Sequence, residues 1–530
     1  MIMIAVVFLL VLIAFVLNRC ILYRRFLSQV DNLPGLRCLF SPFSAVGAML
    51  PTGRFNPGMN WNWIWRNRVY ESFSSDTISI VPFVLGPPMV YTRSAEAIKQ
   101  ILSGSSSFHK TAETTAPIRL WGNSVFAADH DDYKRHRRIV GPSFTSNTYP
   151  PLWRESASLY NEMVESEGWP DSKVTSEIHI PSASRLASKF TMAIIARCAF
   201  GQPIAWQRDI NHASDSVEEK ALQDMPFGDA LRAVSEGAIC RLAAPRWAYK
   251  LGIKTLSDLD RAYTSLRKFM TAFAAFRRAE IAEKSVGVGS VENDLFTRLV
   301  VANEKEGKNG LTDDELIGNT FAFLFAGHET SAHVLAATLA LLALHQDKQE
   351  AVVEQINAVF SAGHETSYED YPKLDKVLAC FLEACRLFPA GAFLIRDTTE
   401  EVRLRSTTGG LLSTMTLPEG TRVVVDMIGY HNHPEYFPDP DAFKPERWYG
   451  QHLESELTMF GFGPRACLGR KFAMVEAVCF LAHIFRDWKL DIILLPGESR
   501  AAWRARVLQG RLLGLAFGVK DVPLRMTRRV

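Results

Sequence analysis

The sequence predicts a mainly α-helical protein with small β-sheets, an α+β class, behind an N-terminal transmembrane helix. An unbroken apolar run opens the chain at Met1–Leu17. A second long apolar segment without proline covers residues 316–345, and most other segments have helical periodicity. Short strand-like runs bounded by turn residues are interspersed among these segments.

The N-terminal run is predicted to be a signal anchor. At about 1.5 Å per residue, a helix over Met1–Leu17 and the next residues just spans a bilayer core. A cleaved signal peptide would need a charged start and a small-x-small cleavage site, and neither occurs. Arg19, Arg24 and Arg25 follow the run, so the positive-inside rule places the rest of the chain in the cytosol.

We expect an anchor at 1–25, a proline-containing linker at 26–50 in which Pro34 stops the helix, and one large domain at 51–530. The chain has 530 residues and 47% hydrophobic content, enough for a sizeable core. Within the domain the pattern predicts a hairpin near 78–93, an amphipathic helix at 294–307, a buried strand at 421–431 and short strands in the C-terminal tail.

Charge and cysteine usage exclude several classes of function. The net charge of +2 provides no basic field for nucleic acid, so no nucleic-acid partner is expected. The eight cysteines form no CxxC pair and have no zinc-site spacing, which favours reduced, buried thiols in a reducing compartment. The glycine-rich run at 285–290 lacks the strand-turn-helix context of a phosphate-binding loop, so we expect a flexible loop there.

The segment 316–345 is predicted to be a buried core helix. His328, Glu329 and Thr330 interrupt it, which argues against a second membrane span. Gly327 costs roughly 1 kcal/mol against alanine inside a helix, which suggests that a large group lies close to the backbone. Two interpretations stay open for the polar residues: satisfied core groups, or a groove in which the Thr330 alcohol and the Glu329 acid relay protons to a ligand.

Glu383 and Arg386 are three residues apart and share one face of a predicted helix. Such a pair is usually a surface ion pair of little energetic value, but its neighbours here are apolar and favour burial. A buried carboxylate can accept two guanidinium groups, so Arg447 is predicted to join a structural cluster with this pair.

The stretch "FGFGPRACLG" holds one cysteine, Cys467, among glycines and before a helical pattern. The helix start and the nearby Arg465 favour a thiolate, and Gly461, Gly463 and Gly469 would let the backbone fold tightly against a flat ligand. No cysteine-protease signature accompanies it. A single thiolate without further protein ligands points to heme. Four residues of the following segment share one face and predict an amphipathic helix: Phe472, Val475, Cys479 and Ala482.

These motifs together resemble those of the cytochrome P450 family of heme-thiolate monooxygenases. They occur in family order: "YKRHRRIVGPSF" at 133–144, "AGHETS" at 326–331, "ExxR" at Glu383 and Arg386, "PERW" at 445–448, and the heme loop at 460–469. The resemblance implies the cytochrome P450 fold, with 51–530 as the catalytic domain.

The resemblance also implies roles for individual residues. Cys467 would be the axial iron ligand of heme b, and its thiolate would favour cleavage of the O–O bond. Thr330 would hydrogen-bond dioxygen and Glu329 would deliver protons. The other residues expected to bind the cofactor are Tyr133, Arg137, Arg396, Phe460, Gly461 and Arg465, the arginines as partners of the propionates. Tyr133 stands where the family usually has tryptophan, and its phenol can still donate a hydrogen bond.

The implied partners are NADPH-cytochrome P450 reductase, which passes on electrons from NADPH, and cytochrome b5 as a further candidate. The implied location is the endoplasmic reticulum membrane, single-pass, with the catalytic domain in the cytosol. An acidic reductase could meet the basic residues Lys134, Arg135, Arg138, Arg470 and Lys471. An ordinary solvated basic face is the alternative for these five residues.

The expected reaction is oxygen-dependent hydroxylation, or a related oxidation, of a lipophilic small molecule. The apolar residues Phe321, Phe323, Leu324 and Phe325 are taken as partly pocket-facing. The similarity to fungal enzymes of secondary metabolism suggests a terpenoid. The alternatives are a fatty-acid or xenobiotic hydroxylase, an oxygen-independent isomerase or dehydratase, and a non-enzymatic heme-binding membrane protein.

Overall fold

The computed structural model describes residues 2–169, 177–201, 206, 225, 227–284, 294–360, 365–408, 410–450 and 458–529. The chain divides into two compact units. The sheet unit comprises Met1–Thr114, Gly391–Ala442 and Leu453–Ala466, and the helical unit comprises Thr115–Ala390, Phe443–His452 and Cys467–Val530. The predicted loop at 285–290 lies outside the described residues, and the predicted boundaries near residues 25 and 50 stay a prediction.

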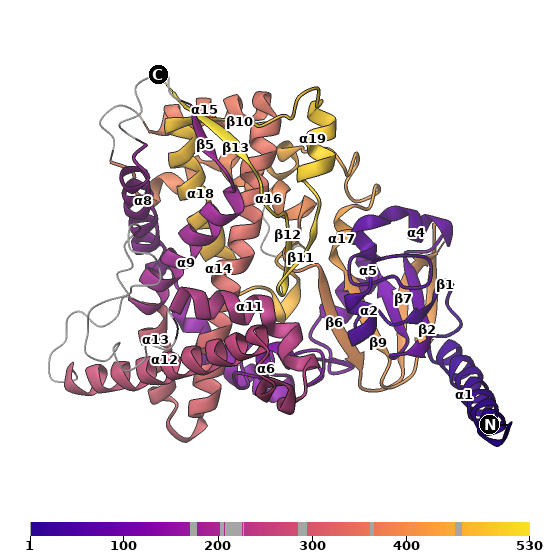
Figure 1. Cartoon of the computed structure of the whole chain (residues 1–530). Coiled ribbons are helices and arrows are strands. Elements are labelled where there is room, and N and C mark those ends of the chain that lie inside the picture. The colour runs from indigo at the N-terminus through magenta and orange to yellow at the C-terminus, as the bar shows by residue number, and fades with distance from the viewer. Residues whose placement is uncertain are drawn as a thin grey trace. The chain divides into compact units, whose positions relative to one another are not determined.

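The sheet unit is built on a six-stranded mixed sheet with the order β1-β2-β3-β9-β6-β4. Its strands are β1 (Gly35–Phe40), β2 (Thr77–Leu85), β3 (Met89–Thr92), β4 (Phe108–His109), β6 (Phe393–Thr398) and β9 (Arg422–Asp426). A separate hairpin pairs β7 (Val402–Thr408) with β8 (Leu411–Leu417). The helices of this unit are α1 (Ile2–Gln29), α2 (Ala45–Met49), α3 (Trp61–Ile64), α4 (Asn67–Ser72), α5 (Ala95–Leu102), α17 (Met427–His431) and the 3₁₀ turn η7 (Gly463–Arg465). Figure 1 shows the long α1 ending against this sheet.

Helix α1 combines a free apolar part with a packed end. The span Met3–Gln29 is long and apolar enough to cross a membrane, and the side chains of residues 3–18 are exposed. Farther along, Tyr23, Phe26 and Leu27 pack on the core of the sheet unit. The helix ends at Gln29, ahead of Pro34. Part of the segment predicted to be a linker forms strand β1.

The predicted hairpin near 78–93 is confirmed, since β2 and β3 pair antiparallel. The predicted strand at 421–431 is wrong in its second half. Strand β9 ends at Asp426, whose side chain accepts a hydrogen bond from the Gly429 N–H at 2.9 Å and caps helix α17. This capping hydrogen bond stabilises a helix start and so interrupts an otherwise apolar strand pattern.

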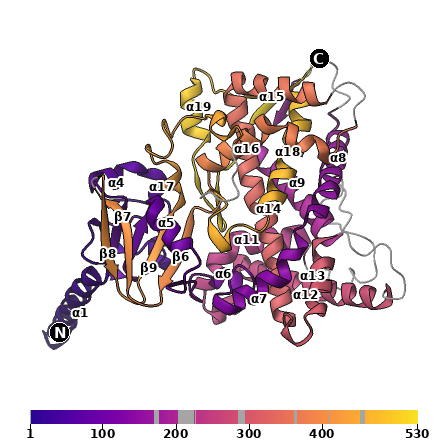
Figure 2. The same ribbon diagram turned by 180° about the vertical axis from the view of Figure 1, so that it is seen from behind.

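The helical unit carries the long helices. They are α6 (Ala116–Arg119), α7 (His130–Val140), α8 (Tyr149–Ser166), α9 (Ala183–Phe200), α11 (Phe227–Ala243), α12 (Lys254–Lys284), α13 (Leu295–Lys305), α14 (Asp313–Leu344), α15 (Gln346–Val359), α16 (Asp375–Leu387), α18 (Arg470–Asp487) and α19 (Arg500–Val507). Its 3₁₀ turns are η1 (Gly141–Ser143), η2 (Ser146–Thr148), η3 (Arg246–Lys250), η4 (Gly307–Asn309), η5 (Tyr368–Lys373) and η6 (Pro445–Trp448). Figure 2, seen from behind, shows α6, α7, α12 and α13 at one end of this unit.

Two small sheets complete the helical unit. One has the order β10-β13-β5, formed by β5 (Ile178–Ile180), β10 (Trp488–Ile492) and β13 (Leu524–Arg528). The other pairs β11 (Arg511–Leu513) with β12 (Ala516–Gly518). The predicted short strands of the tail are therefore confirmed. Helix α13 confirms the predicted helix at 294–307. The predicted class, mainly α-helical with small sheets, is confirmed as well.

Helix α14 is the predicted buried helix, and it runs beside α9, α16 and α18 (Figure 1). Its start is fixed by a capping box in which Thr312 and Glu315 each bind the other's backbone N–H. Almost every side chain beyond Leu316 is buried, because neighbouring helices cover the helix on nearly all sides.

The prediction that helix α18 is amphipathic is wrong. Its residues from Met474 to Phe485 are all buried, including Glu476 and His483. Neighbouring helices α8, α15 and α16 pack against it. The sequence pattern identified one buried face of the helix. It did not predict that the other faces are also buried, because they carry the polar residues Glu476 and His483.

Candidate functional site

One face of α14 is accessible although the helix is otherwise buried. Ala326 is exposed, and Gly327, Thr330 and His333 are half-buried. Their spacing of i, i+1, i+4 and i+7 places them on one side of the helix. The Thr330 hydroxyl donates to the Ala326 carbonyl at 2.7 Å. This strip puts an alcohol and a helix carbonyl together on the only accessible part of the described helix beyond residue 320.

The close approach expected at the backbone of Gly327 is confirmed. A Cβ atom there would lie 2.5 Å from Cδ1 of Ile195, which belongs to α9. Glycine therefore allows the close packing of α9 on α14, and the large group near its backbone is a protein side chain. Thr191 of α9 also donates to the His328 carbonyl at 3.0 Å, which fixes the two helices together at this level.

Glu329 is buried beside the accessible strip. Burial, with a smaller contribution from Glu236, raises the pKa of Glu329 to about 8. A Cβ atom at Gly514, in the β11–β12 turn, would lie 2.5 Å from its Oε1 atom, and Oε2 has no hydrogen-bond partner among the described residues. Glu329 therefore holds a proton at neutral pH. Burial lowers the pKa of His328 and of His333 to about 4, so both are neutral.

Glu329→Gln is expected to change how stability depends on pH. Folded Glu329 keeps its proton up to about pH 8, whereas the unfolded chain releases it near 4.5. The parent therefore loses free energy of unfolding as pH rises between these values, and the variant lacks this loss. Denaturant unfolding at about pH 5 and pH 8 measures the difference. The control is the same substitution at exposed Glu304, and an equal pH dependence for both variants would contradict the assignment.

Cys467 opens the segment that leads into α18, whose N-cap is Gly469. The residue is exposed even though protein atoms surround its sulfur closely. Burial raises the pKa of the thiol, while the backbone N–H groups of Gly469 and Arg470 and the charges of Arg470 and Arg137 lower it. The backbone N–H groups at the helix start favour the thiolate as expected, but desolvation is the larger effect and raises the pKa of the thiol. A bound metal cation deprotonates a coordinating thiol outright.

The loop before Cys467 belongs to the sheet unit up to Ala466. Gly461 and Gly463 have φ values of +86° and +68°, in the left-handed region that favours glycine. A Cβ atom at Gly463 would lie 2.6 Å from the Leu102 carbonyl oxygen, so only glycine fits there. Gly469 has a φ of −83°, which any residue adopts, so its expected role in the tight turn is wrong.

The other residues expected at the cofactor lie in both units. Tyr133 and Arg137 are one turn apart on α7 in the helical unit. Phe460, half-buried, and Arg465 belong to the loop of the sheet unit, and Arg396 lies buried on β6 of that unit. Their roles at the cofactor stay a proposal.

The basic residues expected to face a reductase have contacts within the helical unit. Lys134 pairs with Asp131 at 2.8 Å, and Arg138 pairs with Glu306 at 2.7 Å. Arg135 binds Glu315, and Lys471 lies 3.8 Å from the ring centre of Tyr371. Neighbouring acids therefore offset part of this positive charge.

The predicted cluster around Glu383 is confirmed and is larger than expected. Glu383 and Arg386 have no exposed surface and form a bidentate pair, with N–O distances of 2.9 and 2.8 Å. Arg447 Nε lies 3.4 Å from Glu383 Oε1. Sequence reasoning missed two further donors: Trp448 Nε1 at 2.8 Å and the Lys444 backbone N–H at 3.0 Å. Tryptophan beside the "PER" motif was the available signal.

The predicted aromatic residues of α14 are core residues. Phe321 stacks on Trp121 with ring centres 4.6 Å apart, and Phe323 meets Phe144 edge to face at 5.5 Å. Phe321, Phe323 and Phe325 are all buried. Their expected role in lining a substrate pocket is therefore not supported by their packing.

The donor set fits a heme-thiolate centre. Cys467, an exposed residue, lies at the start of a helix, where two backbone N–H groups and two cations act on its thiol. Glycines form the preceding turn. No second cysteine is near in sequence, and Cys380, Cys385 and Cys479 are buried whereas Cys467 is exposed.

Comparison with known proteins gives a consistent result. The family model described as "Cytochrome P450" matches residues 61–498. "Cytochrome P450 monooxygenase 124" of Postia placenta is 31% identical over 515 residues, covering 96% of each chain. "Cyclooctat-9-en-7-ol 5-monooxygenase" of Streptomyces melanosporofaciens is 28% identical, covering 79% of this chain and 84% of its own. The crystal structure of the cytochrome P450DA heme domain matches with a TM-score of 0.71 at 18% identity, covering 94% of this chain and 99% of that one.

Proposed function

Because the chain belongs to the cytochrome P450 family and has its fold, we propose that it is a membrane-anchored monooxygenase that oxidises a lipophilic secondary metabolite, with a cyclic terpenoid as the leading substrate class. Members of this family bind heme through a cysteine thiolate, and related monooxygenases are named among its relatives. The accessible strip on the otherwise buried α14 is the observation that carries the proposal, because it offers Thr330 beside a protonated acid.

Cys467 would hold the heme, which when bound supplies the activation of dioxygen. Arg137, Arg396 and Arg465 would neutralise the propionates, and Tyr133, Phe460 and Gly461 would complete the cofactor contacts. The Thr330 hydroxyl, now donating to Ala326, can turn to donate to a ligand on the accessible strip. Glu329, which carries a proton at neutral pH, would supply protons on the same stretch of helix.

The substrate class is supported by relatives and not by the aromatic residues of α14. One relative is named as the monooxygenase of an unsaturated alcohol, cyclooctat-9-en-7-ol. Fatty acids and xenobiotics are the competing substrates. An oxygen-independent isomerase or dehydratase is the competing reaction, and it would have no use for a protonated Glu329 beside Thr330.

The test uses the full chain in microsomes with a cytochrome P450 reductase, NADPH and ¹⁸O-labelled dioxygen. Panels of cyclic terpenoids, fatty acids and xenobiotics are compared by mass spectrometry. We expect one labelled oxygen atom in a terpenoid product, with turnover that requires both NADPH and dioxygen. Turnover without either of them would overturn the monooxygenase reaction, and labelled product from fatty acids alone would overturn the substrate class. Adding cytochrome b5 tests that partner.

We place the protein in the endoplasmic reticulum membrane, single-pass, with the folded units in the cytosol. The apolar helix and the arginines after it support this placement.

Deleting residues 2–18 is expected to release the protein into the soluble fraction after an alkaline wash, with its unfolding unchanged. A deletion through residue 29 also removes Tyr23, Phe26 and Leu27 from the core and is expected to lower stability. Membrane retention of the shorter form would contradict a single anchor.

A further inference from the structure

The end of the sheet unit at which strands β1 and β2 finish carries a cluster of exposed apolar side chains. The two strands are parallel, with Phe40 paired to Leu85, and helix α2 follows β1 closely. Met49 is 81% exposed and Phe55 is 62% exposed. Isolated exposed apolar residues are normal on a protein surface, but a cluster of them marks an interaction surface. The members of this apolar patch are Leu39, Val46, Met49, Leu50, Phe55 and Leu85.

Hydrogen bonds to the backbone hold the apolar patch together. The Leu39 N–H donates to the Phe55 carbonyl at 2.8 Å, and the Ser41 N–H donates to the Leu85 carbonyl at 2.9 Å. Asn56 is buried, and its side chain donates at 3.1 Å both to a carbonyl of α2 and to the carbonyl of the residue that ends this helix. These bonds bring residues that are far apart in the chain to one place on the surface.

Helix α1 runs along β2 in the opposite direction. Arg19 Nε donates to the Phe83 carbonyl at 2.6 Å, whereas the Leu33 carbonyl, farther along the chain, accepts from the Ser79 hydroxyl at 2.7 Å. Residue numbers therefore rise along α1 as they fall along β2, so the helix before Arg19 extends past the end of β2. Figure 1 shows α1 leaving the sheet beside β1 and β2. The apolar patch and the exposed residues 3–18 of α1 lie at the same end of the sheet unit.

The charge at this end has one sign. The segments 32–70 and 77–95, which provide the whole apolar patch, contain no aspartate or glutamate. Arg54 is exposed and lies over an aromatic ring of the patch, 5.7 Å from its centre. Arg24 and Arg25 are exposed on α1, shortly after the apolar segment. Apolar side chains beside basic ones are the combination that binds an anionic lipid surface.

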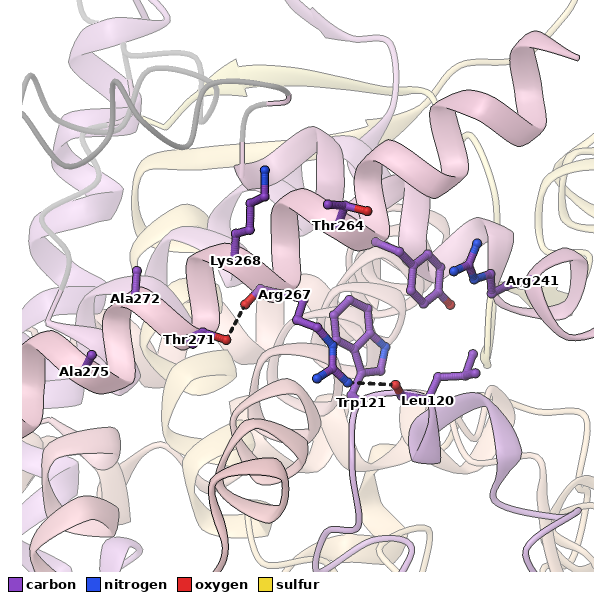
Figure 3. A pocket seen from close by; sticks show the side chains of 10 residues that line it. Leu120, Trp121, Arg241, Thr264, Arg267, Lys268, Thr271, Ala272 and Ala275 are labelled. Carbon is purple, nitrogen blue, oxygen red and sulfur yellow. Dashed lines mark hydrogen bonds between the residues drawn. The ribbon is translucent and has the colours of Figure 1, made fainter. Parts of the chain in front are cut away.

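The cations of the open groove on the helical unit provide a contrast. Figure 3 shows Arg241 and Arg267 in this groove, which is lined by residues of α11 and α12 and by the residues after α6. Each of these two arginines pairs with an aspartate of the helical unit. Among the described residues, by comparison, Arg24, Arg25 and Arg54 have no ion-pair partner. Their charges are therefore available to an anionic surface.

The bilayer that holds α1 is the occupant that this geometry favours for the apolar patch. Inserting the apolar part of α1 brings the same end of the sheet unit to the lipid. We propose that the apolar patch rests in the headgroup layer of that bilayer, and that Arg24, Arg25 and Arg54 face anionic lipids there. The proposal rests on the membrane anchor proposed above. A lone transmembrane helix can tilt by up to about 40°, and this second contact fixes the tilt of the sheet unit.

Photo-crosslinking of the full chain in lipid nanodiscs tests this proposal. The photoreactive residue p-benzoylphenylalanine replaces Met49 in one variant and, as the matched control, Leu412 in another. Leu412 is 65% exposed in the same unit, but it is paired with Thr407, whose carbonyl accepts from the Asp76 N–H next to the start of β2. The control therefore lies about one strand length, roughly 25–30 Å, from the apolar patch. We expect at least about tenfold more lipid adducts, measured by mass spectrometry, at position 49.

The outcomes separate this contact from the anchor. Equal lipid adducts at the two positions would overturn the proposal, as would adducts at position 49 with protein in place of lipid, which would indicate a second copy or a soluble partner. A full chain that enters the nanodiscs without lipid adducts at position 49 would overturn the contact alone. A full chain that does not enter them would overturn the anchor and the contact together.

The lipid composition tests the charge of the contact. Adding phosphatidylserine to phosphatidylcholine nanodiscs is expected to raise the adduct yield at position 49 several-fold, and Arg54→Gln is expected to reduce this gain. Arg68→Gln is the control, because Arg68 is exposed on α4, a helix tied through Asn67 to Arg93 near the start of β2. No gain from phosphatidylserine, or an equal effect of the two substitutions, would contradict the proposed contact with anionic lipids.

Discussion

Glu383→Gln is expected to lower the free energy of unfolding by about 3–5 kcal/mol, or to prevent folding, because it leaves a buried guanidinium without its counter-charge. Arg386 has no exposed surface and donates two parallel hydrogen bonds to this carboxylate. The glutamine side chain can still accept from Trp448, but it cannot balance the charges of Arg386 and Arg447. Urea unfolding followed by circular dichroism measures the loss.

The matched control is Glu446→Gln in the neighbouring "PERW" turn. Glu446 pairs with Lys348, but its side chain is 46% exposed, so the pair is worth about 0–1 kcal/mol. A loss at Glu446 as large as the loss at Glu383 would contradict the assignment of the buried cluster as the structural element of this region.

Thr330→Ala is expected to lower product formation by about 10²-fold while reductase-driven NADPH consumption continues. The variant removes the hydroxyl on the accessible strip but leaves α14 and its buried faces intact. Product formed per NADPH consumed is the measurement, and Thr330→Ser should recover most of the loss because it restores the hydroxyl.

Thr338→Ala provides the control for this prediction. Thr338 makes the same i to i−4 hydrogen bond, at 2.8 Å to the Val334 carbonyl, but its side chain is fully buried two turns farther along α14. It should leave the product yield per NADPH unchanged. Parental yield in Thr330→Ala, or an equal loss in Thr338→Ala, would contradict the proposed role of Thr330.

Sequence reasoning was most successful where a motif is local. Helix α14, the pairing of Glu383 with Arg386 and the left-handed glycines of the loop all depend on spacings of a few residues, and the structure confirms them. Arg447 was also predicted to join the cluster, although it is distant in the chain, because a buried carboxylate can accept two guanidinium groups.

The sequence predictions failed where tertiary packing determines the burial or the contacts of a residue. The pattern of α18 could not reveal that helices cover it on all sides, nor could that of α14 show that Phe321 and Phe323 face other side chains. The net pKa shift of Cys467 depends on how many atoms surround the sulfur, which no local pattern states.

The most direct test of the central assignment is a carbon monoxide difference spectrum of the reduced, heme-supplied full chain beside Cys467→Ala. Cys479→Ala is the control, since Cys479 is a fully buried thiol of α18. We expect the far-red-shifted Soret band of thiolate-ligated heme in the parent and in the Cys479 variant, and its loss in the Cys467 variant. The same band persisting without Cys467, or absent from well-folded parent protein, would contradict the heme-thiolate assignment and every role built on it.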